Sequence, residues 1–333
     1  MLKARFLYLL GALLLSACTT PPAYRIVEGT MLGTTLRIVA ETPDENATLF
    51  REAMALDREA KASMSVFDEQ SLLNRLNRNE TDSLDRHILR NLLLADSISR
   101  LSGGAYDVTI APLTRVWGFA GKQAQAEPNI DSILDFVGFE KLQIEGMRLR
   151  KSDPRVQIDL NSIAKGYTVD LLAEQFEKQG ITNYLVDIGG EVRCRGVNRQ
   201  GRAWRIGIET PFDGNMTNGE YIQQRIALGG GALATSGNYR RFYLDDEGRK
   251  VAHTIDPRTG YSRLSRLLSA TVVAPTCAEA DALCTMLMAL GDKEAVAFSK
   301  EHPTLAIYLI LAGDDGAYAE YRSPAMDELL MAN

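Results

Sequence analysis

Cysteine and histidine are scarce in this sequence, which has four cysteines and three histidines among 333 residues. The cysteines lack the paired spacing of a zinc site. Cys277 and Cys284 lie seven positions apart on one predicted helix, which is too far for a disulfide within that helix. One structural disulfide elsewhere would suit an oxidising compartment, but we expect buried thiols.

Basic residues are also fewer than acidic ones, 37 compared with 43. Removal of residues 1–17 takes away Lys3 and Arg5 and leaves 35 basic residues, a formal charge of −8. Proteins that bind nucleic acid present a basic face. The acidic balance therefore argues against nucleic acid as a partner.

The only candidate membrane segment near the N-terminus, residues 6–15, is too short to span a bilayer, which takes roughly 20 residues. It follows Lys3 and Arg5 as in a secretory signal peptide. Residues 15–18 resemble the bacterial lipobox, so we expect a signal peptide over residues 1–17, lipidation of Cys18 and a tether over residues 18–24. The alternative is an uncleaved anchor with an incidental cysteine. Thr19, in place of the usual retention aspartate, slightly favours the outer membrane over the inner one, with the protein in the periplasm.

No low-complexity linker or internal repeat divides the rest of the chain. Residues 25–333 could therefore form one large domain or two intimate lobes. Apolar spacing predicts helices over residues 46–64 and 83–101, whereas much of residues 192–274 alternates like strands. Helices followed by strands predict an α+β fold with mixed or antiparallel sheets flanked by helices, rather than a doubly wound sheet.

Asp281 and Thr285 are the first candidate site. Thr276 and Glu279 form a capping box that opens a helix running to Leu290, with Gly291 as its stop. Four positions apart on this helix, Asp281 and Thr285 project oxygens from one face. Such oxygens suit a hard cation such as Mg²⁺. The alternative is an aspartate in the capping turn and a threonine bonded to its own helix.

Asp159 and Lys165 belong to a second string, where a predicted strand over residues 156–160 meets a helix over residues 162–179. Asp159 serves equally well as a helix cap or as a ligand contact. A lysine in the first helical turn opposes the helix dipole, so an anionic ligand nearby would explain Lys165. The free N–H groups of the same turn suit phosphate oxygens.

His253 opens a third string, residues 253–260, with Pro257 and Gly260 in turn positions. It is either a turn residue on a hairpin or a general base. The glycine-rich residues 229–231 and 234–238 fit neither a P-loop nor a dinucleotide fingerprint, and flexible strand connections are the preferred interpretation.

Together and in this order, eight blocks resemble the ApbE family of flavin transferases: residues 30–35, 64–68, 104–107 with 112–113 and 117–119, 159–167, 186–190, 235–239, 253–260 and 279–285. The resemblance implies a single large, T-fold-related catalytic domain of two intimate lobes over residues 25–333. It also implies a Mg²⁺-dependent enzyme, with Mn²⁺ as an alternative metal. Such an enzyme moves FMN from FAD onto a Thr or Ser hydroxyl of an acceptor flavoprotein and releases AMP.

Residue roles follow from the same resemblance. The metal would lie on Asp281, Thr285 and the backbone carbonyl of Ser162, and His253 would take the proton of the acceptor hydroxyl. The expected FAD contacts are Met31, Phe67, Ala105, Tyr106, Asp107, Asp159, Lys165 and Ile255.

Three positions depart from the family pattern. Cys284 stands where some relatives have an acidic residue, Phe67 replaces a tyrosine, and Leu32 alters the first block. Two rival functions share the pocket: an FAD pyrophosphatase that uses water, and a flavin-binding lipoprotein without turnover.

Overall fold

The computed structural model describes residues 22–119, 128–213, 215, 219–239, 242–244, 248, 250–263, 265–313 and 316–331. Its centre is an eight-stranded sheet in the order β1-β2-β5-β6-β9-β12-β13-β14, in which every neighbouring pair is antiparallel. The strands are β1 (Ala23–Met31), β2 (Thr34–Thr42), β5 (Tyr184–Ile188), β6 (Glu191–Arg195), β9 (Gly230–Gly237), β12 (Leu267–Ala274), β13 (Ala306–Ala312) and β14 (Tyr318–Arg322).

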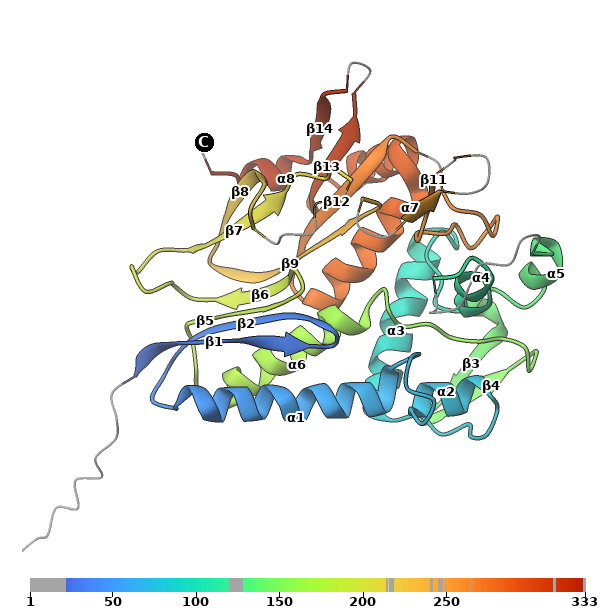
Figure 1. Ribbon diagram of the computed structural model, residues 1–333, viewed down its shortest axis with the longest axis horizontal. Helices are drawn as coiled ribbons and strands as arrows, with labels where there is room; N and C mark the ends of the chain where they lie inside the picture. Colours follow the sequence, from blue (N-terminus) through green and yellow to red (C-terminus); the bar gives the residue numbers. More distant parts are fainter. Residues whose placement is uncertain are drawn as a thin grey trace, which may run out of the picture.

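Helices cover one face of the sheet and a hairpin covers the other. Along β13, Ile307 and Leu309 pack with the helices, whereas Tyr308 and Ile310 pack with the hairpin, because successive side chains of a strand point to opposite faces. The covering elements are α1 (Asn46–Met64), α6 (Ala164–Lys178) and α7 (Cys277–Glu301) on one face, and β7 (Trp204–Glu209), β8 (Ile222–Leu228) and α8 (Pro324–Asp327) on the other. Figure 1 shows α1 and α6 along the same side of the sheet.

The remaining elements form a second region beside the sheet (Figure 1). It shares the core of the first, because Ile88 and Leu92 of its longest helix lie in one apolar cluster with Leu283 and Leu287 of α7. Its elements are α2 (Leu72–Asn77), α3 (Arg86–Leu101), α4 (Ala111–Val116), α5 (Ile130–Leu134), a 3₁₀ turn η1 (Phe139–Lys141), β3 (Leu142–Glu145) and β4 (Arg148–Lys151). A small hairpin of β10 (Phe242–Leu244) and β11 (Lys250–Ala252) completes the described chain.

The α+β prediction is confirmed, but several strands were not foreseen. The chain opens with the β1–β2 hairpin rather than with a helix, and Leu32 and Gly33 form its two-residue turn at φ 51° and 77°. The stretch interpreted as flexible connections is β9, which lies between β6 and β12 in the sheet. Its Ala232 and Ala234 are fully buried, and these small side chains allow α7 to lie close against the strand.

The predicted strand over residues 156–160 was wrong. The segment is buried, yet within the described chain its one bridge joins Gln157 to Ile110, the residue before α4. The side-chain amide of Asn77 takes the place of a partner strand. It accepts from Ile158 N (2.7 Å) and donates to Ile158 O (2.8 Å).

The helix that carries Asp281 was predicted correctly at its start. The hydroxyl of Thr276 accepts from Glu279 N, as in a capping box. Gly291 breaks the helix at φ 77°, as predicted, but a second helical segment continues to Glu301. The first segment therefore presents Asp281 and Thr285 from a rigid, buried helix.

Candidate active site

The first turns of α6 and α7 approach each other closely at Gly166. A Cβ atom on this glycine would lie 2.3 Å from the carbonyl oxygen of Cys277, so no larger residue fits without movement. The approach brings Gly166 N within 3.1 Å of Asp281 Oδ2, to which it donates a hydrogen bond. Asp170 of α6 also caps α7, since its carboxylate accepts from Cys277 N and Ala278 N (both 2.9 Å).

Asp281 is a buried carboxylate at this junction, only 3% exposed. Burial raises its pKa to about 7, while the ammonium group of Lys165 and the Gly166 N–H act in the opposite direction. Thr285 lies one helical turn further on, with its Oγ1 3.4 Å from Ser236 Oγ on β9. A cation beside Asp281 would favour the charged form of this carboxylate.

Lys165 forms an ion pair with Glu191 of β6. Burial acts against its charge, but the carboxylates of Glu191 and Asp281 hold the pKa of Lys165 above its usual value. The side chain of Glu191 is buried, and its Oε2 has no hydrogen-bond partner within the described chain. The anion that the sequence led us to expect near Lys165 is thus supplied, in part, by the protein itself.

The loop after α3 brings Tyr106 to the turn before α6. The hydroxyl of Ser162 donates to the Tyr106 hydroxyl at 3.0 Å. Burial raises the pKa of Tyr106, and the carboxylates of Asp281, Asp107 and Asp159 raise it further. Tyr106 is therefore bonded to Ser162 and lies close enough to Asp281 for that carboxylate to affect its pKa.

His253 lies on a hairpin, residues 252–263, which we call the His253 hairpin. Ser262 closes it, because its Oγ donates to Ala252 O (2.9 Å) and accepts from Ala252 N (3.0 Å). The His253 ring is half-buried and packs edge-on against Phe119, with ring centroids 6.3 Å apart. Phe119 in turn packs against Tyr243 at 5.6 Å.

Two contacts connect this hairpin with the α6–α7 junction. Thr254 donates to the side chain of Asn238 at 2.8 Å, and Asn238 directly follows β9, the strand whose Ser236 approaches Thr285. On the other side, a Cβ atom on Gly104 would lie 3.9 Å from Arg258 of the hairpin. The loop of Tyr106 and the His253 hairpin are therefore neighbours.

Asp256, the acidic residue of the same hairpin, is bonded to arginine. It is 1% exposed and accepts from Arg258 N (3.0 Å), Nε (2.9 Å) and Nη2 (2.9 Å), and Arg263 Nη1 lies 3.6 Å away. Both oxygens of this carboxylate therefore already accept from arginine. Of the two, His253 is the better candidate for proton transfer.

A cavity of about 480 Å³ is lined in part by Asp159, Gln157 and Arg115. Asp159 accepts from Asn161 N at 2.8 Å, so it caps the turn before α6 rather than the helix itself. Val66 also lines this cavity, and its neighbour Phe67 is 62% exposed. Of the predicted FAD contacts, Asp159 thus lines this cavity and Phe67 directly follows a residue that does.

Comparison with known proteins identifies the family. The sequence profile of the ApbE family matches residues 32–309. The chain belongs to the ApbE family. Two relatives named FAD:protein FMN transferase, from Vibrio cholerae and Haemophilus influenzae, are each 35% identical; the matches cover 97% and 92% of this chain and 97% and 91% of theirs.

Solved ApbE structures have the same fold. The flavin transferase ApbE from Vibrio cholerae superposes with a TM-score of 0.82 at 34% identity, over 93% of this chain and all of that one. The apo flavinyl transferase ApbE from Pseudomonas stutzeri gives 0.83 at 28% identity, over 94% and 98%. The predicted family and fold class are confirmed.

The ApbE fold brings some predicted site residues together more closely than others. Asp281, Lys165, Ser162 and Tyr106 surround the α6–α7 junction, and Thr285 is one turn away. The carboxylate of Asp107 is engaged in hydrogen bonds within the protein. It accepts from Thr109 N and Oγ1 (both 2.7 Å) and from Phe139 N (2.6 Å). The other predicted contacts are buried, namely Met31 (1% exposed), Ala105 (1%) and Ile255 (3%), and Cys18 lies outside the described residues.

Sequence reasoning missed Glu191, Ser236 and Asn238 as members of the site. Glu191 directly follows a block used for the family resemblance, and a charged residue at a buried strand position was a usable signal. Ser236 and Asn238 were assigned to a flexible connection. The cysteines were predicted correctly, because Cys194, Cys277 and Cys284 are free and buried. Cys284 donates to Ala234 O at 3.1 Å and packs the helix against β9.

Proposed function

We propose that this chain transfers the FMN half of FAD onto a Thr or Ser hydroxyl of an acceptor protein, with Mg²⁺ as cofactor and AMP as leaving group. Flavin transfer is the activity of the relatives named above. The observation that carries the proposal for this chain is the α6–α7 junction, where Gly166, Lys165 and Asp281 meet.

The donor set fits a hard cation. Asp281, Thr285 and the carbonyl of Ser162 offer only oxygen, which Mg²⁺ and Mn²⁺ prefer. Within the described ranges, no group of three or more His, Cys, Asp or Glu side chains is placed to hold a metal. One carboxylate alone binds Mg²⁺ weakly, so we propose that phosphate oxygens of FAD complete the coordination. When bound, the ion would offset the charge of the pyrophosphate and of the transition state.

The protein's own groups account for the remaining steps. Lys165, fixed by Glu191, places a positive charge at the start of α6, where free backbone N–H groups also favour phosphate. His253 takes the proton from the acceptor hydroxyl as its oxygen bonds to the phosphorus of FMN. The bond to the AMP phosphate oxygen then breaks. General-base help of this kind is typically worth about 10²–10⁴-fold in rate.

The same pocket would also let water replace the acceptor, which gives FMN and AMP as free products. The test is to incubate the purified protein with FAD and Mg²⁺, with and without an acceptor protein. We expect a covalent FMN adduct on the acceptor by intact mass and one AMP for each adduct. AMP release with no adduct would favour the pyrophosphatase, and FAD binding without AMP would favour a flavin carrier.

Location is proposed from the sequence alone. Residues 1–21 lie outside the described chain. Among the described residues, no helix has the length and apolar character needed to cross a bilayer. We propose that lipid on Cys18 anchors the protein to the periplasmic side of a membrane, the outer membrane being slightly favoured. Metabolic labelling with a radioactive fatty acid, lost in Cys18→Ala, tests this.

A further inference from the structure

Tyr261 is an exposed aromatic residue on the same hairpin as His253. Its side chain is 54% exposed, and its ring lies 5.7 Å from the ring of Trp117 at an angle of 56°. A single exposed tyrosine needs no explanation in itself. What distinguishes Tyr261 is how rigidly the His253 hairpin that carries it is held.

Two sets of contacts hold that hairpin, one on each side. On one side, the indole N–H of Trp117 donates to Gly260 O at 2.7 Å, and Ile255 packs into an apolar cluster with Leu113 and Ile130. A side chain at Gly260 would collide with that cluster, since a Cβ atom would lie 2.4 Å from Ile130. The tip of the hairpin is therefore fixed against α4 and α5.

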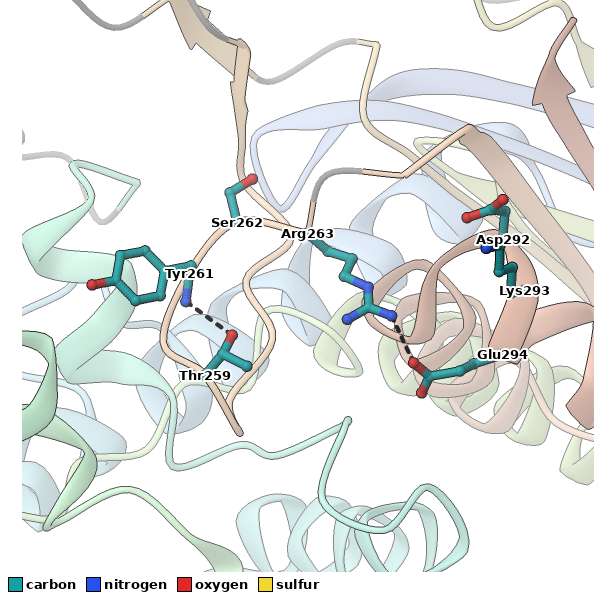
Figure 2. Close-up of a pocket in the computed structure, with 7 residues that line it drawn as sticks. All are labelled: Thr259, Tyr261, Ser262, Arg263, Asp292, Lys293 and Glu294. Atoms are coloured by element: carbon teal, nitrogen blue, oxygen red, sulfur yellow. Dashed lines mark hydrogen bonds and ion pairs between the residues drawn. The ribbon is translucent and has the colours of Figure 1, made fainter.

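On the other side, Arg263 ties the hairpin to α7. Its Nη2 donates to Glu294 at 2.6 Å (Figure 2). It also donates to Leu290 O at 2.8 Å, a carbonyl that lies where Gly291 breaks the helix. A Cβ atom on Gly291 would lie 2.9 Å from Arg263 Nε, so this contact requires glycine. A residue on such a backbone loses little entropy when a partner binds it.

A cavity opens beside Tyr261, between the hairpin and the second segment of α7. Its volume is about 450 Å³, within the usual range for binding sites of about 300–1,000 Å³. Figure 2 shows Tyr261, Thr259 and Ser262 on one wall and Asp292 and Lys293 on the other. The Arg263–Glu294 ion pair crosses it, so two of its charges already neutralise each other. The lining suits peptide groups and polar side chains better than a strongly charged ligand.

The cavity is lined by residues of the hairpin that carries His253, the group that would take the acceptor's proton. Ser262, which lines it, bonds to both backbone groups of Ala252, the residue before His253. A general base acts on a hydroxyl within about 2.6–3.2 Å. A polypeptide rises about 3.3 Å per residue when extended. Residues that flank the reacting hydroxyl must therefore pass over the surface around His253.

We propose that Tyr261 and this cavity form the docking surface for the polypeptide segment of the acceptor protein that carries the reacting Ser or Thr. An apolar side chain of that segment packs on the rings of Tyr261 and Trp117. The adjacent peptide groups and a polar side chain enter the cavity. The inference rests on the proposed function, because it assumes that His253 receives a hydroxyl from a protein.

The test compares Tyr261→Ala with Tyr261→Phe, which keeps the ring, and with Tyr318→Ala, a control tyrosine that is 37% exposed on the edge strand β14. The probe is the protein acceptor of the Vibrio cholerae relative, purified without flavin. Three quantities are measured: the KM for this acceptor, kcat at saturating acceptor, and the Kd of FAD from the quenching of flavin fluorescence. Unfolding temperatures are recorded for each variant.

We expect Tyr261→Ala to raise the acceptor KM about tenfold, the effect of removing an aromatic anchor from an interface. The Kd of FAD and kcat should stay within twofold of wild type, and the other two variants should behave as wild type. An unchanged acceptor KM in Tyr261→Ala, or a parallel rise in the Kd of FAD, would overturn the docking surface alone. A wild-type protein that binds FAD yet labels no acceptor would contradict the proposed function as well.

Discussion

Gly166 is the position where the geometry of the site can be tested with one methyl group. In Gly166→Ala, the new Cβ atom would lie 2.3 Å from the carbonyl oxygen and 2.6 Å from the carbonyl carbon of Cys277. Ordinary contacts begin near 3.4 Å, so α6 and α7 must separate by about 1 Å at this point. The hydrogen bond from Gly166 N to Asp281 then lengthens or breaks.

The expected cost follows from these contacts. Overpacking in a close-packed core costs about 1–3 kcal/mol, and losing a hydrogen bond to a charged group costs about 1.5–3 kcal/mol. The higher helix propensity of alanine returns about 1 kcal/mol. We therefore expect Gly166→Ala to lower the free energy of unfolding by about 3 kcal/mol. A shift of about 1 Å at reacting groups costs about 10²-fold in rate, so FMN transfer by the folded variant should fall by at least that factor.

Chemical denaturation measures the first effect, and single-turnover FMN transfer at a temperature where both proteins are folded measures the second. Gly229→Ala is a matched control, because a Cβ atom there meets nothing within 4 Å. It should change the free energy of unfolding by less than about 0.5 kcal/mol. If Gly166→Ala is as stable and as active as Gly229→Ala, the two helices do not approach as described.

Two further predictions concern His253 and Asp281. His253→Ala should lose about 10²–10⁴-fold in transfer rate while the Kd of FAD stays near that of wild type; a near-native rate with FAD bound would assign proton transfer to another group. Burial raises the pKa of Asp281 to about 7, so the folded protein without metal retains this proton at a pH where the unfolded chain has lost it. This group therefore lowers stability as pH rises from about 4 to 7, and Mg²⁺ should raise Tm more at pH 8 than at pH 5. Equal Mg²⁺-induced shifts of Tm at the two pH values would show that Asp281 is not the carboxylate that binds the metal.

Elements whose apolar spacing reflects their own burial could be predicted from the sequence. Helix α1 begins and ends at Asn46 and Met64 as its periodicity indicates, and Thr276 caps α7 through a local motif. Strand β9 could not be found in this way. Its glycines and alanines disfavour a strand locally, and they are used because α7 lies against it, as the bond from Cys284 to Ala234 O shows.

The same distinction holds for the site. Asp281 and Thr285 share a helix, so their proximity follows from a spacing of four residues. Glu191 acts on Lys165 from a strand 26 positions away, and no local pattern predicts that contact. Likewise, the role of Gly166 depends on the position of Cys277, which only the packing of α6 against α7 determines.

The proposed site depends most directly on Asp281 as the carboxylate that would hold Mg²⁺ against FAD. The decisive measurement is a Mg²⁺ titration of AMP release and FMN-adduct formation for wild type and Asp281→Asn. Asparagine retains an oxygen that can accept from Gly166 N, so the fold should survive while the charge is lost. We predict that wild type saturates at millimolar Mg²⁺ or below and that Asp281→Asn shows no metal-dependent turnover over the same range. Superimposable titrations of the two proteins would contradict the proposed site.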